Sequence, residues 1–314
     1  MRRYIVRRLE QSLIVVIAVT LIVFLMLHVL PGGPARALMG PRASAAALHE
    51  FIVANGYNSP VFVQYWHYLA NITHGNLGFS YHFNETVVAL LEQNLPKSAI
   101  LVGIAIALAL CIALPLGLLQ AHYRNRVGDH VVTTLALAGY SMPSFWLGLL
   151  LIEAFAISLH VLPPEAPQGE TVGAILSQPT ALVLPVATLT IVTTALFSRF
   201  MRSSAIEALV QDYVRTARAE GVSPRGILWG HVFRNSVLPI ITLVGINIPG
   251  IIGGALLVEV VFNFPGMGLL FWNAASVHDY PVLMGCTLVI GVATVLGNLL
   301  ADILYAVADP RVRY

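Results

Sequence analysis

Six apolar stretches, each long enough to cross a membrane as a helix, constrain this chain more than any other feature. A hydrocarbon layer about 30 Å thick is crossed by roughly 20 apolar residues in a helix. The stretches of that length are Leu13–Leu30, Ala99–Gln120, Val131–Leu159, Ala181–Met201, Val237–Phe262 and Val282–Val307. Because lipid offers the backbone no hydrogen-bond partners, such stretches must satisfy their own polar groups. The sequence therefore predicts an all-α membrane protein with six transmembrane helices.

The basic residues predict how these helices are oriented. With both termini placed in the cytoplasm, fourteen of the 17 Lys and Arg residues lie inside, and only Arg36, Arg42 and Lys97 lie outside. This asymmetry is the one that cytoplasmic loops usually show. We therefore predict a multi-pass protein of the cytoplasmic (inner) membrane of a prokaryote. The net charge of +2 reflects this orientation, and nucleic-acid binding is not indicated.

Three regions follow from this topology. Residues 1–30 form the cytoplasmic N-terminus and the first helix, residues 31–95 form a large external loop, and residues 96–314 form a five-helix core. The external loop carries an apolar stripe that includes Tyr65 and Trp66, which suits helices at the membrane interface. We expect Asn84 to cap a further helix that leads to Leu95-Pro96. Within the core, residues 203–235 form the main cytoplasmic loop.

A short polar helix-turn-helix lies in that cytoplasmic loop. Glu207 to Glu220 reads as a helix, and Gly221 fits the left-handed residue that ends one. Ser223-Pro224 fits the N-cap and first turn of a second helix. A polar segment of this size between two apolar stretches is too small to be a domain. Its size and polarity suit a small surface that another protein binds.

This segment resembles the cytoplasmic coupling loop of ABC-importer permeases, the membrane subunits driven by separate ATPase subunits. Ala217-Arg218-Ala219 stands where many members have Glu-Ala-Ala, a variant typical of the peptide-permease branch. The resemblance to the dipeptide/oligopeptide permeases, as the first permease of the pair, spreads over most of the chain. It rests on His28-Val-Leu-Pro31-Gly32, Gln64-Tyr65, Gly75-Asn-Leu-Gly78, Ser141-Met-Pro143-Ser-Phe145, Arg234-Asn235, Glu259-Val-Val-Phe262-Asn-Phe-Pro265-Gly266, Asp279-Tyr-Pro281, Asp302-Ile-Leu-Tyr305 and Asp309-Pro-Arg311. Gly33 departs from the family, where Asp is common after Pro-Gly.

The resemblance implies a type I ABC-importer permease fold and a subunit that moves peptides or related small solutes. The implied partners are a homologous second permease, two ATP-binding subunits, an external solute-binding protein and membrane lipid. This chain would hold no cofactor, since ATP and Mg would be bound by the partner subunits. The implied ATPase-coupling residues are Arg215, Thr216, Ala217, Arg218, Ala219, Glu220 and Gly221. The solute itself, whether dipeptide, oligopeptide or metal chelate, stays open.

No enzymatic chemistry is indicated in this chain. Its one lysine, Lys97, does not follow a glycine-rich loop, so a phosphate-binding P-loop is absent. Gly139-Tyr-Ser141-Met-Pro143 ends in Pro where a serine elbow needs Gly. Cys111 and Cys286 both lie within apolar stretches, which argues against a disulfide or a metal site. We therefore predict no catalytic residue and no metal, and leave a ligand role of the external histidines open.

Helix breaks near the middle of two spans mark a candidate solute path. Proline removes a backbone hydrogen bond, and in lipid such breaks persist where backbone lines a cavity or is resealed by neighbours. A packing kink is the equally weighted alternative. The candidate path or gate residues are Ser141, Pro143, Pro249, Gly250 and Glu259. For Glu259 two roles are open: a part of the external gate, or a cap that holds the Asn263–Gly268 loop.

An ion-coupled secondary carrier is the alternative function. It would need ionisable groups deep in the membrane, which are costly and usually functional. The candidates are Glu153, Glu259 and Asp302, and all three lie toward the ends of spans. Groups in such positions reach water or a loop partner easily, so the ABC permease is the preferred interpretation.

Overall fold

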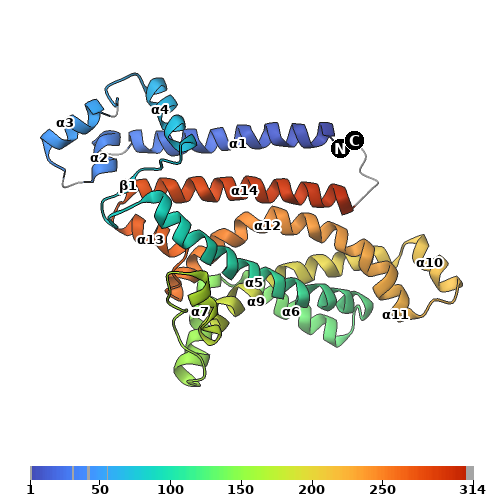
Figure 1. Ribbon diagram of the computed structural model, residues 1–314. Coiled ribbons are helices and arrows are strands. Elements are labelled where there is room, and N and C mark those ends of the chain that lie inside the picture. Colours follow the sequence, from blue (N-terminus) through green and yellow to red (C-terminus); the bar gives the residue numbers. More distant parts are fainter. Residues whose placement is uncertain (1, 30–31, 41–42, 55, 309–314) are drawn as a thin grey trace.

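The computed structural model is a layered bundle of long helices with groups of short helices at its ends (Figure 1). It describes the backbone of residues 2–29, 32–40, 43–54 and 56–308, with the side chains of 2–8, 27, 246–254 and 301–308 left out of the description. The long helices are α1 (Arg2–Val29), α5 (Val87–His122), α6 (Val127–Ser141), α9 (Pro179–Leu209), α12 (Phe233–Val261) and α14 (Tyr280–Ala308). The short helices are α2 (Gly33–Met39), α3 (Ala45–Ala54), α4 (Val61–Thr73), α7 (Ser144–Leu151), α8 (Val172–Leu176), α10 (Asp212–Ala219), α11 (Pro224–Gly226) and α13 (Met267–Ser276), with π-helical turns η1 (Ile152–Ser158) and η2 (Ile227–Val232).

The two ends of the bundle carry different short elements. Helix α10 lies at one end, where α1 begins and α14 finishes, and α2, α3, α4 and α13 gather at the opposite end (Figure 1). We call these the α10 end and the α13 end. A small antiparallel hairpin of β1 (Phe79–Ser80) and β2 (Glu85–Thr86) also lies at the α13 end, with Phe79 opposite Thr86. Apart from this hairpin the regular elements of the described structure are all helices, so the predicted all-α class is confirmed.

The six predicted spans correspond to five single helices and one broken pair. Five helices are long and apolar enough to cross a membrane, and α6 with α7–η1 supplies a sixth if both halves belong to one span. These halves meet at 106°. The third span was expected to be one long stretch with a break near Pro143, and the structure turns that break into a sharp corner.

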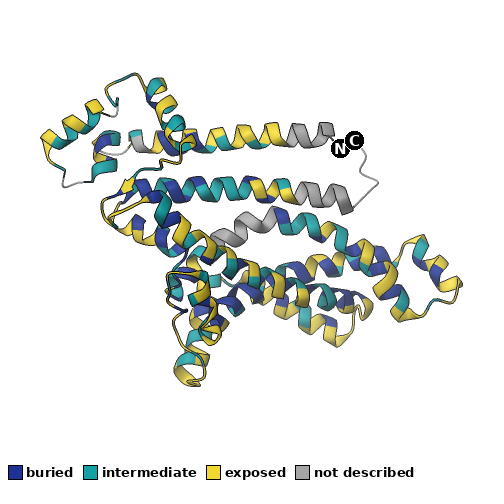
Figure 2. Ribbon diagram, viewed as in Figure 1, coloured by how far each residue is buried: buried dark blue, intermediate teal, exposed yellow. Residues whose placement is uncertain are grey.

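The centre of the bundle is formed by α5 packed along α9. Gly117 of α5 lies so close to α9 that an added Cβ would come within 2.5 Å of the Ser198 carbonyl oxygen and 2.7 Å of Met201. The two helices approach closely here because glycine has no side chain. Buried residues concentrate on these central helices, whereas α1 is largely exposed (Figure 2).

The predicted helix cap at Asn84 is wrong. Helix α5 begins at Val87 and runs through Pro96, so it continues across residue 95, where the external region was expected to end. Its cap is Thr86, whose hydroxyl accepts from the Ala89 amide at 3.3 Å, and Asn84 instead sits at φ 55° in the hairpin turn. The Thr86 hydroxyl, two residues after Asn84, caps the helix instead. Threonine and asparagine are both common N-cap residues.

The expected break at Pro249-Gly250 is also absent from the described backbone. Helix α12 continues across both positions from Phe233 to Val261. Helices in lipid tolerate proline when neighbours or local adjustments satisfy the freed carbonyl. The side chains at 249 and 250 lie outside the described residues, so their predicted role in the path is not placed by the structure.

Candidate coupling surface and gate region

The turn after α10 has the geometry that its glycine predicts. Gly221 has φ +79°, which is the left-handed region. The Val222 amide donates to the Ala217 carbonyl at 3.0 Å, and the Gly221 amide donates to the Arg218 carbonyl at 3.1 Å. This pair of bonds is the Schellman motif that closes many helices. The predicted left-handed end of the helix at Gly221 is confirmed.

The predicted single helix from Glu207 to Glu220 is wrong. Helix α9 ends at Leu209, and α10 starts at Asp212 after the extended residue Gln211. The corner between Leu209 and Asp212 contains neither glycine nor proline, the residues that usually predict such a break. The helix following Gly221 starts as predicted, because the Ser223 hydroxyl accepts from the Gly226 amide at 3.2 Å.

Helix α10 has an exposed surface and a buried base, which we call the foot. The foot consists of Ala217, one of the predicted coupling residues, and of Val214, which was not among them. Both are buried with Ile227, Leu228 and Val232 in a cluster that also includes residues of α5 and α9. The remaining predicted residues are exposed at the tip: Arg215, Thr216, Arg218, Ala219, Glu220 and Gly221. We call this exposed set the coupling tip. Ala217 therefore packs inward, beneath the coupling tip.

The foot of α10 fixes the coupling tip to the long helices. Burial raises the pKa of the Tyr213 phenol above its usual value of 10.0, because the charged form would lose its hydration. The cluster beneath α10 joins α9, η2 and the start of α12. A force applied to the tip therefore reaches two long helices through close-packed side chains.

The corner of the broken span exposes two of the predicted path residues. Helix α6 ends at Ser141, Met142 and Pro143 are extended, and α7 starts at Ser144. Both Ser141 and Pro143 are exposed in the chain taken alone. Helix α7 packs on α12, where a Cβ added at Gly148 would lie 3.0 Å from the Phe262 ring. The break therefore redirects the chain onto the α13 end of α12.

The predicted gate residue Glu259 is buried in a network of donors. Its side chain is 1% exposed. One carboxylate oxygen accepts from the Ser98 hydroxyl at 2.6 Å, and the other accepts from the Gly268 amide at 2.6 Å. The Ser98 hydroxyl also accepts from the Met267 amide at 2.8 Å. Glu259 thus ties α12 to α5 and to the first turn of α13.

The space around this carboxylate is closed. A Cβ at Gly266 would lie 2.5 Å from a Glu259 carboxylate oxygen, and one at Gly268 would collide with Leu256. The geometry favours the capping role of Glu259 over a role as an open gate. Sequence reasoning placed a loop directly after α12, although Met267 and Gly268, the last two residues of the predicted loop, begin α13. It missed Ser98, which is 161 residues distant from Glu259 and carries no local signal.

A buried ion pair near the α10 end was also missed by sequence reasoning. Arg202 of α9 meets Asp129 of α6 through two hydrogen bonds of 2.7 Å, and the Asp129 side chain is 1% exposed. The Asn125 amide adds a third bond at 3.0 Å. The only local signal is an acidic residue in the first turn of α6, a position that helix dipoles favour.

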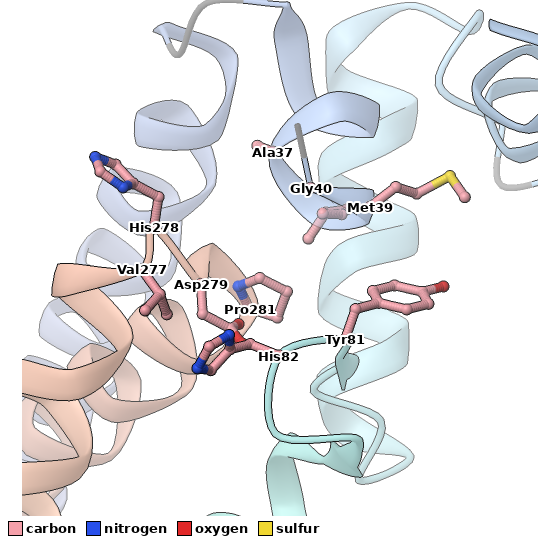
Figure 3. A pocket seen from close by; sticks show the side chains of 10 residues that line it. Ala37, Met39, Gly40, Tyr81, His82, Val277, His278, Asp279 and Pro281 are labelled. Atoms are coloured by element: carbon pink, nitrogen blue, oxygen red, sulfur yellow. The ribbon is translucent and has the colours of Figure 1, made fainter. Parts of the chain in front are cut away.

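Two of the histidines that were expected outside border a pocket at the α13 end. His82 and His278 line this cavity of about 440 Å³ together with Tyr81 and Met39, between α2 and the turn before α14 (Figure 3). Asp279 also lines it, but its oxygens accept from the Ser80 hydroxyl at 2.5 Å and the Val282 amide at 3.3 Å. No group of three potential metal ligands occurs within the described residues.

Comparisons with known proteins find relatives that match this chain over its whole length. The family described as binding-protein-dependent transport system inner membrane component matches residues 113–314, and the N-terminal family of the same systems matches residues 1–102. The oligopeptide transport system permease protein AppB of Bacillus subtilis is 37% identical over 316 residues, covering 100% of both chains. A putative peptide permease protein of Brucella ovis is 40% identical, covering 100% of this chain and 99% of its own. The glutathione transport system permease protein GsiC of Escherichia coli is 35% identical, covering 100% of both chains.

Proposed function

Because this chain belongs to the binding-protein-dependent transport system inner membrane components, we propose that it carries peptides across the cytoplasmic membrane as one permease subunit of an ABC importer. Similar chains are named for oligopeptide and glutathione transport, and both solutes are built from peptide-linked amino acids. These matches give no support to the ion-coupled carrier.

The coupling proposal rests on one observation: the exposed coupling tip stands on buried residues of α10 that pack against the long helices. A polar projection between two long helices is suited to binding in a cleft of another protein. The buried residues beneath it pack against α9 and α12, so a movement of the tip moves these helices as well. In this proposal an ATP-binding subunit holds the tip. ATP closes the pair of ATP-binding subunits, and the long helices then shift between two states. ATP moves this equilibrium only by its different affinity for those states.

The remaining partners are proposed on the same basis. A second, homologous permease, two ATP-binding subunits and an external solute-binding protein complete the assembly, with ATP and Mg held outside this chain. Helix α1 exposes a large apolar surface, because Ile14, Ile22 and Met26 are 66%, 59% and 62% exposed. An apolar side of this extent requires lipid or another subunit.

Replacing Gly221 tests the coupling tip. We expect Gly221→Val to insert normally but to lower ATP-driven uptake by about 5- to 150-fold, the factor for a strain of roughly 1–3 kcal/mol. The strain arises because a β-branched residue disfavours φ +79°. The measurement is uptake together with ATP hydrolysis in the reconstituted complex. Gly221→Asn is the matched control, since asparagine tolerates the left-handed region. Normal uptake by Gly221→Val would remove the coupling assignment.

Cysteine labelling tests the proposed orientation. In a chain with Cys111 and Cys286 replaced, we expect His74→Cys and Glu170→Cys to react with an impermeant thiol reagent added outside intact cells. Arg124→Cys and Arg225→Cys should react only after the cells are opened. All four positions are exposed. Labelling of Arg225→Cys in intact cells would place the coupling tip outside and overturn the proposed orientation.

A further inference from the structure

A cavity of about 320 Å³ lies between the end of α5 and the start of α6. The turn that joins these helices lies toward the α10 end (Figure 1). A water molecule in the liquid takes about 30 Å³, so the cavity has room for a group of several atoms. Its lining is both apolar and polar, and includes Leu116, Leu119, Val132, Gln120, Arg126 and Asp129.

The buried side of this cavity contains a hydrogen-bond acceptor without a partner. Gln120 is 6% exposed, and within the described residues its amide oxygen accepts no hydrogen bond. Its amino group donates to the Thr133 hydroxyl at 3.3 Å, and that hydroxyl donates to Asp129 at 3.4 Å. The amide oxygen is therefore the end of Gln120 that stays unpaired. A buried polar group in this state is costly, so a donor from outside the chain would stabilise it.

A cation stands at the mouth of the same cavity. Arg126 is exposed, and its guanidinium carbon lies 5.2 Å from the centre of the Tyr123 ring, which also lines the cavity. This cation–π contact positions the guanidinium. Among the described residues no carboxylate forms an ion pair with Arg126, because the nearby Asp129 is bound by Arg202. The cavity thus combines an available cation at its mouth with an unpaired acceptor on its buried side.

The position of the cavity favours a lipid as its occupant. Helix α5 is long and apolar enough to cross a membrane, and α6 begins the broken span. A turn between such helices lies at a membrane surface, because irregular backbone is not stable in contact with hydrocarbon. From the cavity an apolar stripe continues along α5 at helical spacing, formed by Leu119, Leu116, Ile112 and Leu108. Three of these side chains, at 108, 112 and 119, are exposed, so the stripe can hold an acyl chain.

We propose that this cavity binds a phospholipid whose headgroup carries a primary ammonium, that is, phosphatidylethanolamine. The phosphate accepts from Arg126, and the ammonium donates to the unpaired oxygen of Gln120. A charged donor forms a stronger hydrogen bond than a neutral one. Basic pockets between transmembrane helices are suited to lipid headgroups. The inference goes beyond the proposed function, because lipid binding here does not depend on which solute the protein carries.

The test compares phosphatidylethanolamine with phosphatidylcholine of the same acyl chains. Both lipids have the same phosphate, but the trimethylated nitrogen of choline has no N–H donor. The purified chain is stripped of lipid in detergent, each lipid is added, and native mass spectrometry measures the dissociation constant. We expect phosphatidylethanolamine to bind about tenfold or more tightly, the factor for a hydrogen bond to a charged group.

Two substitutions separate the two ends of the headgroup. Gln120→Met removes the unpaired acceptor, while the Thr133 hydroxyl keeps its bond to Asp129. It should bring the two affinities to within about twofold of each other without lowering the melting temperature of the lipid-free chain. Arg126→Gln should weaken both lipids by a similar factor, since both carry the phosphate, and it should leave the lipid-free chain unchanged. Arg124→Gln is the matched control, because Arg124 is exposed in the same turn and should affect neither lipid.

Three results would overturn the inference. Equal affinity of the unmodified chain for the two lipids would show that the acceptor binds no ammonium. An undiminished preference in Gln120→Met would place the ammonium elsewhere. Binding that disappears once the partner subunits are assembled would show that a protein covers the cavity. If Gln120→Met does not fold, Arg126→Gln carries the test, and unchanged binding of both lipids in it would count against the site.

Discussion

Glu259→Gln is expected to lower the thermal stability of the assembled importer and its transport activity in the same proportion. The carboxylate accepts from the Ser98 hydroxyl and the Gly268 amide, one on each oxygen. An amide side chain keeps one acceptor and turns an NH₂ group toward the other donor. Leaving a buried donor unsatisfied costs about 1–3 kcal/mol. The measurements are the melting temperature of the purified complex and its uptake rate.

Glu153→Gln provides the matched control for this variant. Glu153 is an exposed glutamate of η1, and its replacement should leave both quantities unchanged. A stable, fully assembled Glu259→Gln complex with an altered basal ATPase rate would show instead that Glu259 acts in the gate. The role of Glu259 as a link between α5, α12 and α13 would then be wrong.

Arg202→Gln is expected to be the more severe substitution. It leaves the Asp129 carboxylate, whose side chain is 1% exposed, without the guanidinium that neutralises it. Breaking a buried pair in this way typically costs about 3–5 kcal/mol. Removing the buried charge as well, in Asp129→Asn with Arg202→Gln, should recover part of that loss. Chemical denaturation of the purified chain in detergent measures the free energy of unfolding of both variants.

Comparing the unfolding free energies of these variants shows whether the loss of stability comes from an uncompensated Asp129 charge. Arg126→Gln is the control, because Arg126 is exposed at the same turn. A double variant less stable than Arg202→Gln alone would contradict the interpretation that an uncompensated buried charge is the cause. Stability of Arg202→Gln within about 0.5 kcal/mol of the unmodified chain would also contradict it.

Local signals in the sequence predicted local structure well. Apolar stretches predicted the spans because their length must match the membrane. Gly221 and Ser223 predicted the turn after α10, since each has a conformational or capping property of its own. Pro143 predicted a break, although not its 106° angle. That angle depends on how α7 packs on α12, which no local pattern encodes.

The contacts that define the sites were not predictable in this way. Ser98 and Glu259, like Asp129 and Arg202, are far apart in the sequence and are brought together by helix packing. The corner at Gln211 lacks Gly and Pro, so the helix from Glu207 was expected to continue through it.

The most direct test of the central claim is peptide uptake by proteoliposomes that contain this chain with its partner permease, the ATP-binding subunits and the solute-binding protein. Uptake should require ATP and Mg on the side that carries the coupling tip, and it should persist without any ion gradient. The Gly221→Val complex should hydrolyse ATP with little uptake. Peptide uptake that follows a proton or sodium gradient, and that continues without ATP or the ATP-binding subunits, would contradict the claim.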